Sequence, residues 1–444
     1  MKRNTWTSDS VRERHGVGRE RAVLVGVLLD GRPLIDDPLD ELAELARAAG
    51  ADAVDRVVQR RQSYDAASCV GRGKLEEIRQ RADASEANVV LFDNDLSPSQ
   101  IRVIEKATGR KVLDRSELIL DIFASRARTH EARLQVELAQ LEYTAPRLRG
   151  MWTHLERIAG AGGGTGVGAV GGIGTRGPGE RQIEIDRRIV KRRIGILKEK
   201  LAEIDRRKVR EVRARGEHFM VSLVGYTNAG KSTLMNALTG ADARVEDMLF
   251  ATLDTLTRRW SLGEGRHVLL SDTVGFIRDL PHHLVASFRA TLEEAIHADL
   301  LLHVVDASSP DAADQIRIVH DVLRELGAGE RPALLLLNKI DRIRDDAAFA
   351  VLRQQFVDAL PISAKTRTGL RELAAAVDDR LLGEQEYMTL SIPVADGRAF
   401  NFLERYATIL ERRYEENRAI TEIKIAPRAL EHLHSFAADV RRID

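Results

Sequence analysis

The chain has 444 residues, too many for one hydrophobic core, so three or more domains are expected. Its 43% apolar and 5% aromatic residues are typical of a soluble protein, and its longest apolar runs, residues 300–305 and 333–337, are too short to span a membrane. A polar N-terminus without a signal peptide, a single cysteine (Cys69) and a net charge of zero exclude a secreted disulfide scaffold and predict a cytoplasmic protein.

The N-terminal part alternates between strand and helix patterns. Residues 1–20 are polar and predict a disordered tail. Strand patterns follow at residues 22–29, 53–59 and 88–92, and helical patterns at 38–49, 73–82 and 98–108. Alternation of this kind predicts a parallel α/β domain over residues 21–125.

After residue 125 the apolar spacing changes to alternating steps of four and three. The first run is Leu134, Leu138, Leu141, Ala145, Leu148, Trp152 and Leu155, and the second is Val190, Ile194, Leu197, Leu201 and Ile204. Each run is a heptad seam, which predicts an antiparallel two-helix arm over residues 126–215, about 45 Å long. Pro146 is expected to kink the first helix.

A glycine-rich segment, residues 160–179, joins the two predicted helices, and eleven of its twenty residues are glycine. Such a segment cannot hold a helix, so we expect a mobile loop at the tip of the arm. It is either a passive linker or a tip that approaches RNA closely, with Arg176 and Arg181 supplying positive charge.

The net charge of zero hides a strong segregation. Residues 1–215 carry 41 Lys/Arg against 33 Asp/Glu, and residues 216–444 carry 27 against 35. The arm accounts for the basic surplus, with 21 basic and 11 acidic side chains. This distribution favours an arm that binds nucleic acid, next to a neutral partner domain. The alternative is that the basic residues form only a solvated helical surface.

Residues 216–384 repeat the alternating pattern, with strand runs at 219–224, 267–271, 300–305, 333–337 and 360–362. They predict a doubly wound G domain. Residues 385–444 contain strand patterns at 387–394 and 420–425 and a helical pattern at 400–410, which predicts a small α+β domain.

A phosphate-binding loop follows the first strand of the predicted G domain and precedes a helical stretch at residues 233–238. It consists of Gly225, Tyr226, Thr227, Asn228, Ala229, Gly230, Lys231 and Ser232. The glycines let backbone N–H groups wrap the phosphates. Lys231 is expected to reach the β- and γ-phosphates, and Ser232 to hold Mg²⁺ through its hydroxyl.

Three later motifs lie at strand ends: Asp272, Thr273, Val274 and Gly275; Asn338, Lys339, Ile340 and Asp341; and Ser363, Ala364 and Lys365. Asp272 is expected to reach Mg²⁺ through water, and the Gly275 N–H to sense the γ-phosphate. The Asp341 carboxylate can accept from two guanine N–H groups that adenine lacks, so GTP and GDP are the predicted ligands. The Ser363 segment can back the guanine O6.

Between these motifs lie Phe250, Ala251, Thr252, Leu253 and Asp254. Thr252 is the predicted second hydroxyl ligand of Mg²⁺, with Thr255 and Thr257 as competing candidates. The predicted catalytic residues are therefore Lys231, Thr252 and Gly275.

Phe276 stands where many regulatory GTPases have a glutamine that orients the attacking water. We therefore expect slow intrinsic hydrolysis that accelerates when a partner orders residues 241–257 and 273–283. His282 and His283 are interpreted as surface residues of that second segment. Asn228 is either a ligand for K⁺ or a turn residue.

Several of these motifs resemble those of the HflX family of GTPases. They are Gly225 to Ser232, Phe250 to Asp254, Asp272 to Ile277, Asn338 to Asp341, Val70 to Lys74, Asp114 to Leu118 and Gly171 to Glu180. The resemblance covers nearly the whole chain from about residue 20, and its most specific parts lie outside the G domain.

The resemblance implies a monomeric cytoplasmic GTPase that binds the large (50S) ribosomal subunit and splits stalled or idle ribosomes under stress. It also implies that the N-terminal α/β domain and the arm at residues 126–215 contact ribosomal RNA, and that residues 160–179 point toward the peptidyl transferase centre. A ribosomal protein is a candidate partner of the C-terminal domain. The alternative is a nucleotide-gated ribosome- or RNA-binding module in ribosome assembly, for which hydrolysis only resets the switch. No residues for base chemistry and no membrane anchor are visible, which disfavours tRNA modification and membrane remodelling.

Overall fold

The computed structural model describes residues 20–30, 37–147, 178–214, 219–240, 248–250, 255–263, 266–278, 295–382 and 385–443. Two compact units are present: residues 1–201 with 281–287, and residues 202–280 with 288–444. Predictions for residues 1–19, most of the glycine-rich segment, residues 241–247, Thr252 with its neighbours 251–254, and the two histidines at 282 and 283 lie outside the described residues. None of the described helices is both long and apolar enough to cross a bilayer.

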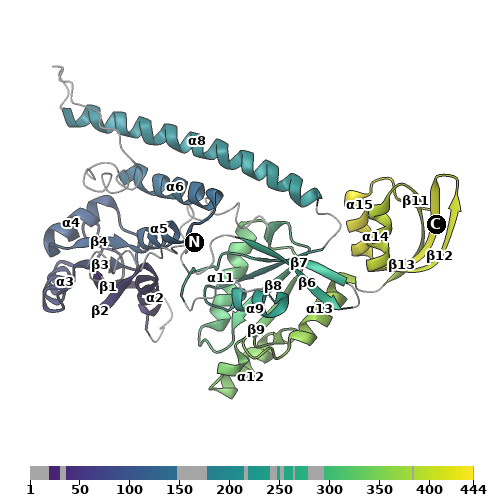
Figure 1. Ribbon diagram of the computed structural model, residues 1–444. Helices are drawn as coiled ribbons and strands as arrows, with labels where there is room; N and C mark the ends of the chain where they lie inside the picture. The colour runs from purple at the N-terminus through teal and green to yellow at the C-terminus, as the bar shows by residue number, and fades with distance from the viewer. Residues whose placement is uncertain are drawn as a thin grey trace, which may run out of the picture. The chain divides into compact units, whose positions relative to one another are not determined.

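The first unit contains a four-stranded parallel sheet with the order β2-β1-β3-β4. Its strands are β1 (Glu20–Leu29), β2 (Ala51–Arg61), β3 (Val89–Phe92) and β4 (Lys111–Asp114), and its helices are α2 (Asp40–Ala49), α3 (Arg72–Ala84), α4 (Pro98–Thr108) and α5 (Arg115–Arg126) (Figure 1). The predicted alternation of strand and helix is confirmed. Strand β4 was not predicted, because only two of its four residues are apolar, whereas all four residues of β3 are.

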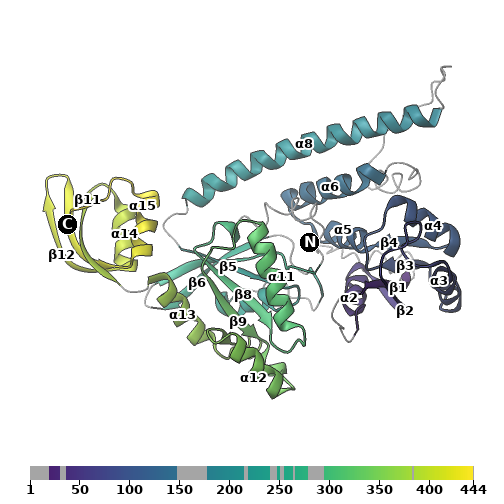
Figure 2. The same ribbon diagram turned by 180° about the vertical axis from the view of Figure 1, so that it is seen from behind.

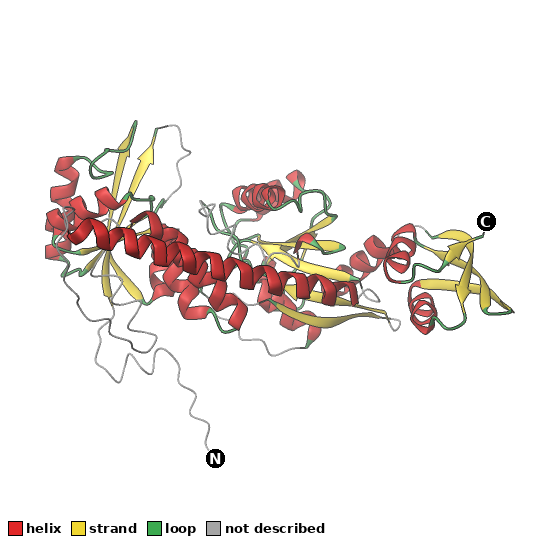
Figure 3. Ribbon diagram, turned by 90° about the horizontal axis from the view of Figure 1, so that it is seen from above, coloured by secondary structure: helices red, strands yellow, loops and turns green. Residues whose placement is uncertain are grey.

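Three further elements follow α5: α6 (His130–Thr144), a 3₁₀ turn η1 (Ala145–Arg147) and α8 (Pro178–Ala214). The expected kink at Pro146 is instead the end of the α-helix, since the chain tightens into η1 there. At 37 residues, about 55 Å, α8 is a long unbroken helix (Figure 3). It begins at Pro178, a favourable residue for a first turn, so the glycine-rich segment ends two residues earlier than predicted.

Helices α6 and α8 lie side by side (Figures 1 and 2), and two ion pairs fix their relative direction. Arg193 pairs with Glu137 at 2.6 Å, and Lys198 pairs with Glu142 at 2.8 Å. From the first ion pair to the second, the contact moves five residues toward the C-terminus on both helices. If the helices were antiparallel, these two moves would have opposite directions, and the second pair would be about 15 Å apart. The predicted antiparallel packing is therefore wrong for α6 and α8, which run parallel.

A buried carboxylate fastens the end of α6 to the sheet of the first unit. The Asp114 side chain caps α5 and accepts hydrogen bonds from the Tyr143 hydroxyl at 2.8 Å and the Arg147 guanidinium at 3.3 Å. That guanidinium also stacks 3.4 Å from the centre of the Tyr143 ring and donates to the Leu96 carbonyl. Asp114 therefore has an internal structural role, because all of these partners belong to the same unit.

The second unit contains a six-stranded sheet with the order β10-β9-β8-β5-β7-β6. Its strands are β5 (Met220–Gly225), β6 (Leu256–Gly263), β7 (Arg266–Asp272), β8 (Leu300–Asp306), β9 (Ala333–Asn338) and β10 (Leu360–Pro361). All five predicted strands are present and parallel, and β6 is an unpredicted antiparallel edge strand.

Helices cover both faces of this sheet (Figures 1 and 2). One apolar cluster joins it to α9 (Lys231–Thr239) and α13 (Leu370–Leu382), and another joins it to α11 (Ala312–Glu325) and α12 (Asp346–Gln355). Alternate residues of β8 serve the two clusters: Leu302 and Val304 face the first, and Val305 faces the second. Burial on both faces explains why this strand is apolar throughout.

The C-terminal residues form a four-stranded sheet with the order β12-β13-β11-β14 and two helices. The elements are β11 (Glu386–Pro393), α14 (Gly397–Tyr406), β12 (Ala407–Glu415), β13 (Arg418–Ile425), α15 (Pro427–Phe436) and β14 (Arg441–Arg442). The predicted helix at residues 400–410 ends at Tyr406, because the backbone becomes extended at Ala407 and pairs with β13.

The C-terminal helices and the six-stranded sheet belong to one continuous apolar core. The Phe219 ring lies edge-on to the Tyr406 ring, with centroids 5.2 Å apart, and stacks on His432 at 4.6 Å. The Tyr406 hydroxyl donates to the His267 carbonyl oxygen at 2.7 Å. Residues on both sides of position 385 therefore stabilise the same core.

Candidate functional site

The loop between β5 and α9 is shaped by two glycines that no other residue could replace without strain. Gly225 has φ +150°, and a Cβ there would lie 2.2 Å from the Val304 carbonyl oxygen. Gly230 has φ +95°, and a Cβ there would lie 2.4 Å from the Asn338 amide nitrogen. These close approaches let the loop turn tightly over the end of the sheet, with the N-terminus of α9 behind it.

Lys231 occupies the first turn of α9 and is buried. Its Nζ donates to the Gly225 carbonyl oxygen at 3.0 Å and to the Tyr226 carbonyl oxygen at 2.8 Å. Burial lowers the pKa of this ammonium to about 8, while the nearby Asp272 carboxylate raises it. The loop therefore holds a desolvated positive charge whose interaction with an anion is strong in this environment.

Ser232 and Asp272 bring two oxygen ligands together beside Lys231. The Ser232 hydroxyl donates to the Asp272 carboxylate at 2.6 Å, and Asp272 is only 2% exposed. Hydroxyl and carboxylate oxygens suit Mg²⁺, so the residues present fit this ion. Within the described residues there is no cluster of three or more His, Cys, Asp or Glu side chains that would suggest a different metal.

The segment after β7 is interlocked with the phosphate-binding loop. The Thr227 N–H donates to the Phe276 carbonyl oxygen at 2.7 Å, and the Phe276 N–H donates to the Gly225 carbonyl oxygen at 3.0 Å. A Cβ at Gly275 would lie 2.8 Å from the Thr227 Cα and 2.9 Å from the Lys231 Nζ. Gly275 is therefore in direct contact with the loop, and a movement of either segment would displace the other.

Phe276 is only 2% exposed and is held by these backbone bonds. Its side chain carries no group that could orient a water molecule, as expected from the sequence. The residue instead serves the connection between the two loops. The sequence did not predict this connection, because hydrogen bonds between backbone atoms do not depend on which side chains are present.

Asn338 ties the phosphate-binding loop to the segment after β10. Its Nδ2 donates to the Ala229 carbonyl oxygen at 2.8 Å, and its Oδ1 accepts from the Ala364 N–H at 3.0 Å. Asn338 is 2% exposed, so both bonds are made away from water. Three predicted motifs are thus brought together around one side chain.

Asp341 lies in the turn η2 (Ile340–Arg342) and presents an exposed carboxylate. Its Oδ1 accepts from the buried Ser363 hydroxyl at 2.5 Å, and the Ser363 oxygen in turn accepts from the Thr366 N–H. A carboxylate oriented in this way can accept the two adjacent N–H groups of guanine.

Lys339 has φ +62°, and its ammonium pairs with Asp306 at 2.7 Å. Asp306 was not predicted as part of the site. Its place at the carboxyl end of β8, beside the ends of β5 and β9, could have indicated it, because functional side chains gather at such ends.

The structure thus gathers most of the predicted site at one edge of the six-stranded sheet. Phe250, which has φ +55°, is buried. Thr252 and its neighbours Ala251, Leu253 and Asp254 lie outside the described residues, so their assignment stays a prediction.

A basic surface is present on α8, in the first unit. Arg187, Arg188, Lys191, Arg192 and Lys200 are exposed, and none of them pairs with a carboxylate of a described residue. Arg193 and Lys198 are instead neutralised by α6. Several unneutralised cations on one helix are typical of a nucleic-acid interface.

Three family models match the chain. The GTP-binding GTPase N-terminal family matches residues 36–124, the GTP-binding GTPase middle region matches residues 126–215, and the 50S ribosome-binding GTPase family matches residues 220–339. Together they cover the first unit from residue 36 onward, α8, and the nucleotide site as far as Lys339.

Curated relatives match over most of their length. The chain is 42% identical over 433 residues to the GTPase HflX of Caldanaerobacter subterraneus subsp. tengcongensis, which covers 97% of this chain and 96% of the relative. It is 43% identical over 389 residues to the GTPase HflX of Escherichia coli K12, which covers 87% and 88%. A solved structure of a GTP-binding protein from the archaeon Sulfolobus solfataricus in complex with GDP has 26% identity and a TM-score of 0.40, covering 81% of this chain and 98% of that one.

The guanine-nucleotide site, the family models and the curated relatives lead to one assignment. The chain has a ribosome-binding GTPase domain, it binds GTP and GDP, and it hydrolyses GTP. It belongs to the HflX family of GTPases.

Proposed function

We propose that this GTPase binds the large ribosomal subunit through ribosomal RNA and dissociates stalled or idle 70S ribosomes under stress, in the cytoplasm and as a monomer. The observation that carries the proposal is the exposed basic side chains of α8, which no described carboxylate neutralises, in the same chain as a guanine-nucleotide site. Phosphate contacts of this kind supply most of the affinity of proteins for nucleic acids. The match to the 50S ribosome-binding GTPase family supports the choice of target.

The domain roles follow the predicted boundaries. Residues 21–125 and 126–215 contact ribosomal RNA, and the glycine-rich segment at 160–179 points toward the peptidyl transferase centre. Residues 216–384 bind the nucleotide, and residues 385–444 contact a ribosomal protein. The interlock between Gly275 and the phosphate-binding loop supports nucleotide control, since it transmits a change at the γ-phosphate to the following segment.

Within the site, Lys231 binds the β- and γ-phosphates, Gly275 senses the γ-phosphate, and Asp341 selects guanine. Ser232 and Thr252 would hold a Mg²⁺ ion, with Asp272 reaching it through water. The bound ion would neutralise phosphate charge, and the chain's own contribution is to position these oxygens and exclude water. The buried position of Lys231 supports its role, because a desolvated ammonium attracts phosphate oxygens strongly.

Intrinsic hydrolysis is slow because Phe276 offers no group to orient water, and binding to the large subunit accelerates it. Asn228, which has φ +60°, is a candidate K⁺ ligand that would supply the missing charge. Comparing GTP turnover in KCl and NaCl, with and without large subunits, tests both points. Equal rates in the two salts would remove K⁺, and fast turnover by the isolated chain would contradict the role given to Phe276.

A second candidate is a nucleotide-gated ribosome- or RNA-binding module in ribosome assembly, for which hydrolysis serves only as the reset. The apolar Phe276 favours this alternative, because a switch has no need for rapid turnover. A variant that binds GTP without hydrolysing it distinguishes the two candidates. A pure switch should still split ribosomes once per bound GTP, whereas an energy-coupled enzyme should not.

The main test is co-sedimentation with purified large subunits in GDP and in a non-hydrolysable GTP analogue. Binding should be stronger in the analogue, and Arg187→Glu with Arg188→Glu and Arg192→Glu should weaken it at least tenfold. The matched control also reverses three exposed arginines, Arg317→Glu and Arg324→Glu on α11 with Arg353→Glu on α12. Equal sedimentation in both nucleotides, or equal loss in the control, would overturn the proposal.

A further inference from the structure

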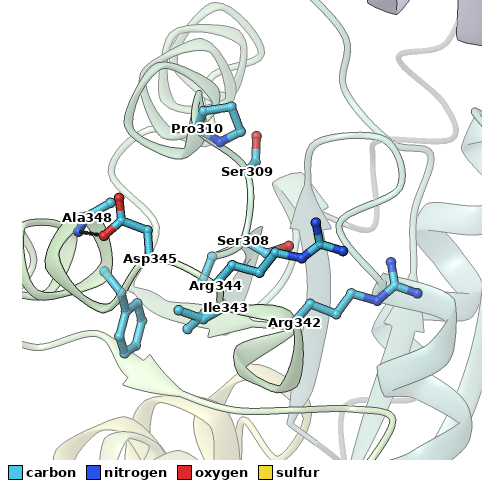
Figure 4. Close-up of a pocket in the computed structure, with 10 residues that line it drawn as sticks. Ser308, Ser309, Pro310, Arg342, Ile343, Arg344, Asp345 and Ala348 are labelled. Carbon is cyan, nitrogen blue, oxygen red and sulfur yellow. Dashed lines mark hydrogen bonds between the residues drawn. The ribbon is translucent and has the colours of Figure 1, made fainter.

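A cavity of about 410 Å³ lies between the loop that follows β8 and the start of α12 (Figure 4). One wall is the loop at residues 307–310, which follows β8, and the other is the segment 342–349, which leads from η2 into α12. Ala307 directly follows Asp306, and Arg342 directly follows Asp341. The cavity is therefore next to the nucleotide site but uses none of its side chains.

The floor of this cavity is apolar. Ala307 belongs to the apolar cluster beneath α11 and α12, and Ile343 and Phe349 pack against that cluster. Ala348 adds a methyl group from the first turns of α12, and Val351, one turn further along that helix, is 64% exposed. An apolar floor of this kind is suited to a bulky apolar side chain.

The rim of the cavity is positively charged. Arg342 and Arg344 are both exposed, and neither pairs with a carboxylate of a described residue. Figure 4 shows their guanidinium groups extending to the same side of the cavity. The carboxylate of Asp345, the acidic residue next to them, already accepts from the Ala347 and Ala348 N–H groups as the cap of α12. Two arginines at one edge therefore remain available for carboxylates.

We propose that this cavity binds a short segment of another protein in which a bulky apolar side chain stands next to carboxylates. The apolar floor takes the side chain, and Arg342 and Arg344 take the carboxylates. A nucleic acid would use the arginines but leave the apolar floor empty. A protein segment uses both features.

The experiment uses the full chain loaded with GDP and fluorescein-labelled synthetic ten-residue peptides, followed by fluorescence anisotropy. One peptide consists of Asp, Glu, Leu and Phe, and a second has Lys in place of its acids. Unlabelled poly(U) RNA is added as a competitor. Two variants test the charged rim and the apolar floor separately. Arg342→Glu with Arg344→Glu reverses the charge of the rim, and Ala348→Trp fills the cavity above the floor. Arg353→Glu and Ala350→Trp, at exposed positions of α12 outside the cavity, are the matched controls.

We expect saturable binding of the acidic peptide, weakened at least tenfold by each cavity variant and unchanged by each control. Thermal unfolding of every variant confirms that the chain is folded. The proposal is overturned if the acidic peptide does not bind, if controls and cavity variants lose binding equally, or if the lysine peptide binds as well. Displacement by poly(U) that depends on Arg342 and Arg344 would assign the site to nucleic acid instead. These outcomes do not depend on the proposed ribosomal function, because no ribosome is present.

Discussion

Replacing Asp341 by asparagine should change the base that the site selects. The Ser363 hydroxyl holds the Asp341 carboxylate from behind at 2.5 Å, so the carboxylate should face guanine in a fixed orientation. Asparagine keeps one acceptor but places an NH₂ group against the guanine 2-amino group. Hydrogen bonds to a charged group contribute roughly 1.5–3 kcal/mol each, so disturbing two of them should cost about 3–6 kcal/mol. GDP affinity should then fall by a factor of about 10² to 10⁴.

The same substitution should improve the binding of xanthine nucleotides. Xanthine carries a carbonyl oxygen in place of the 2-amino group, and the new NH₂ group can donate to it. Titration with fluorescent GDP and XDP measures both effects on one protein sample. Asp345→Asn is the matched control, since asparagine caps a helix as well as aspartate and Asp345 contacts the N-terminus of α12.

Two results would refute this reasoning. If Asp341→Asn bound GDP within about threefold of the unaltered chain, the carboxylate would not carry guanine selection. If GDP affinity fell without any gain for XDP, the substitution would have disturbed the turn η2 and not the recognition of the base. Ser363→Ala should have a smaller effect, about 1 kcal/mol, because it removes one supporting hydrogen bond.

Three further perturbations follow from the geometry. Gly275→Ala should lower GDP affinity at least tenfold, because the new methyl group would lie 2.8 Å from the Thr227 Cα; equilibrium titration measures it. GDP affinity should also fall as pH rises above about 8, since the pKa of Lys231 is lowered to about 8 by burial and only the ammonium form attracts phosphate; titrations between pH 7 and 9 check this. Glu117→Gln should stabilise the first unit near pH 7.5 but have little effect near pH 4.5, as calorimetry of the full chain would show. Burial, assisted by Asp114, raises the pKa of Glu117 to about 8.

The sign of the Glu117 effect is set by proton binding. Between pH 4.5 and 8 the folded chain keeps the Glu117 proton and the unfolded chain does not, so stability falls as pH rises through that window. Each pH unit contributes about 1.4 kcal/mol, so the gain at pH 7.5 is at most roughly 4 kcal/mol. If the difference in stability between Glu117→Gln and the unaltered chain were the same at pH 4.5 and pH 7.5, the raised pKa assigned to Glu117 would be contradicted.

For Gly275→Ala the control is Gly397→Ala, where a Cβ would meet nothing within 4 Å.

The sequence alone determined the nucleotide chemistry. Gly225, Lys231, Asp272 and Asp341 each follow or end a strand, and parallel strands bring their carboxyl ends to one edge of a sheet. Because those strands are long and apolar, their pattern was visible, and the site assembled where the motifs predicted. The family resemblance rests on the same local information. Thr252 remains a prediction from sequence, as it lies outside the described residues.

The tertiary structure alone decided which elements meet. A heptad pattern marks the apolar side of a helix but does not fix the direction of its partner, so only the ion pairs of Arg193 and Lys198 revealed that α6 and α8 run parallel. The contact of Asp306 with Lys339 and the packing of Phe219 on Tyr406 join residues far apart in the chain. Local periodicity carries no information about such pairs, because their energy comes from burial and charge that exist only once the chain has folded.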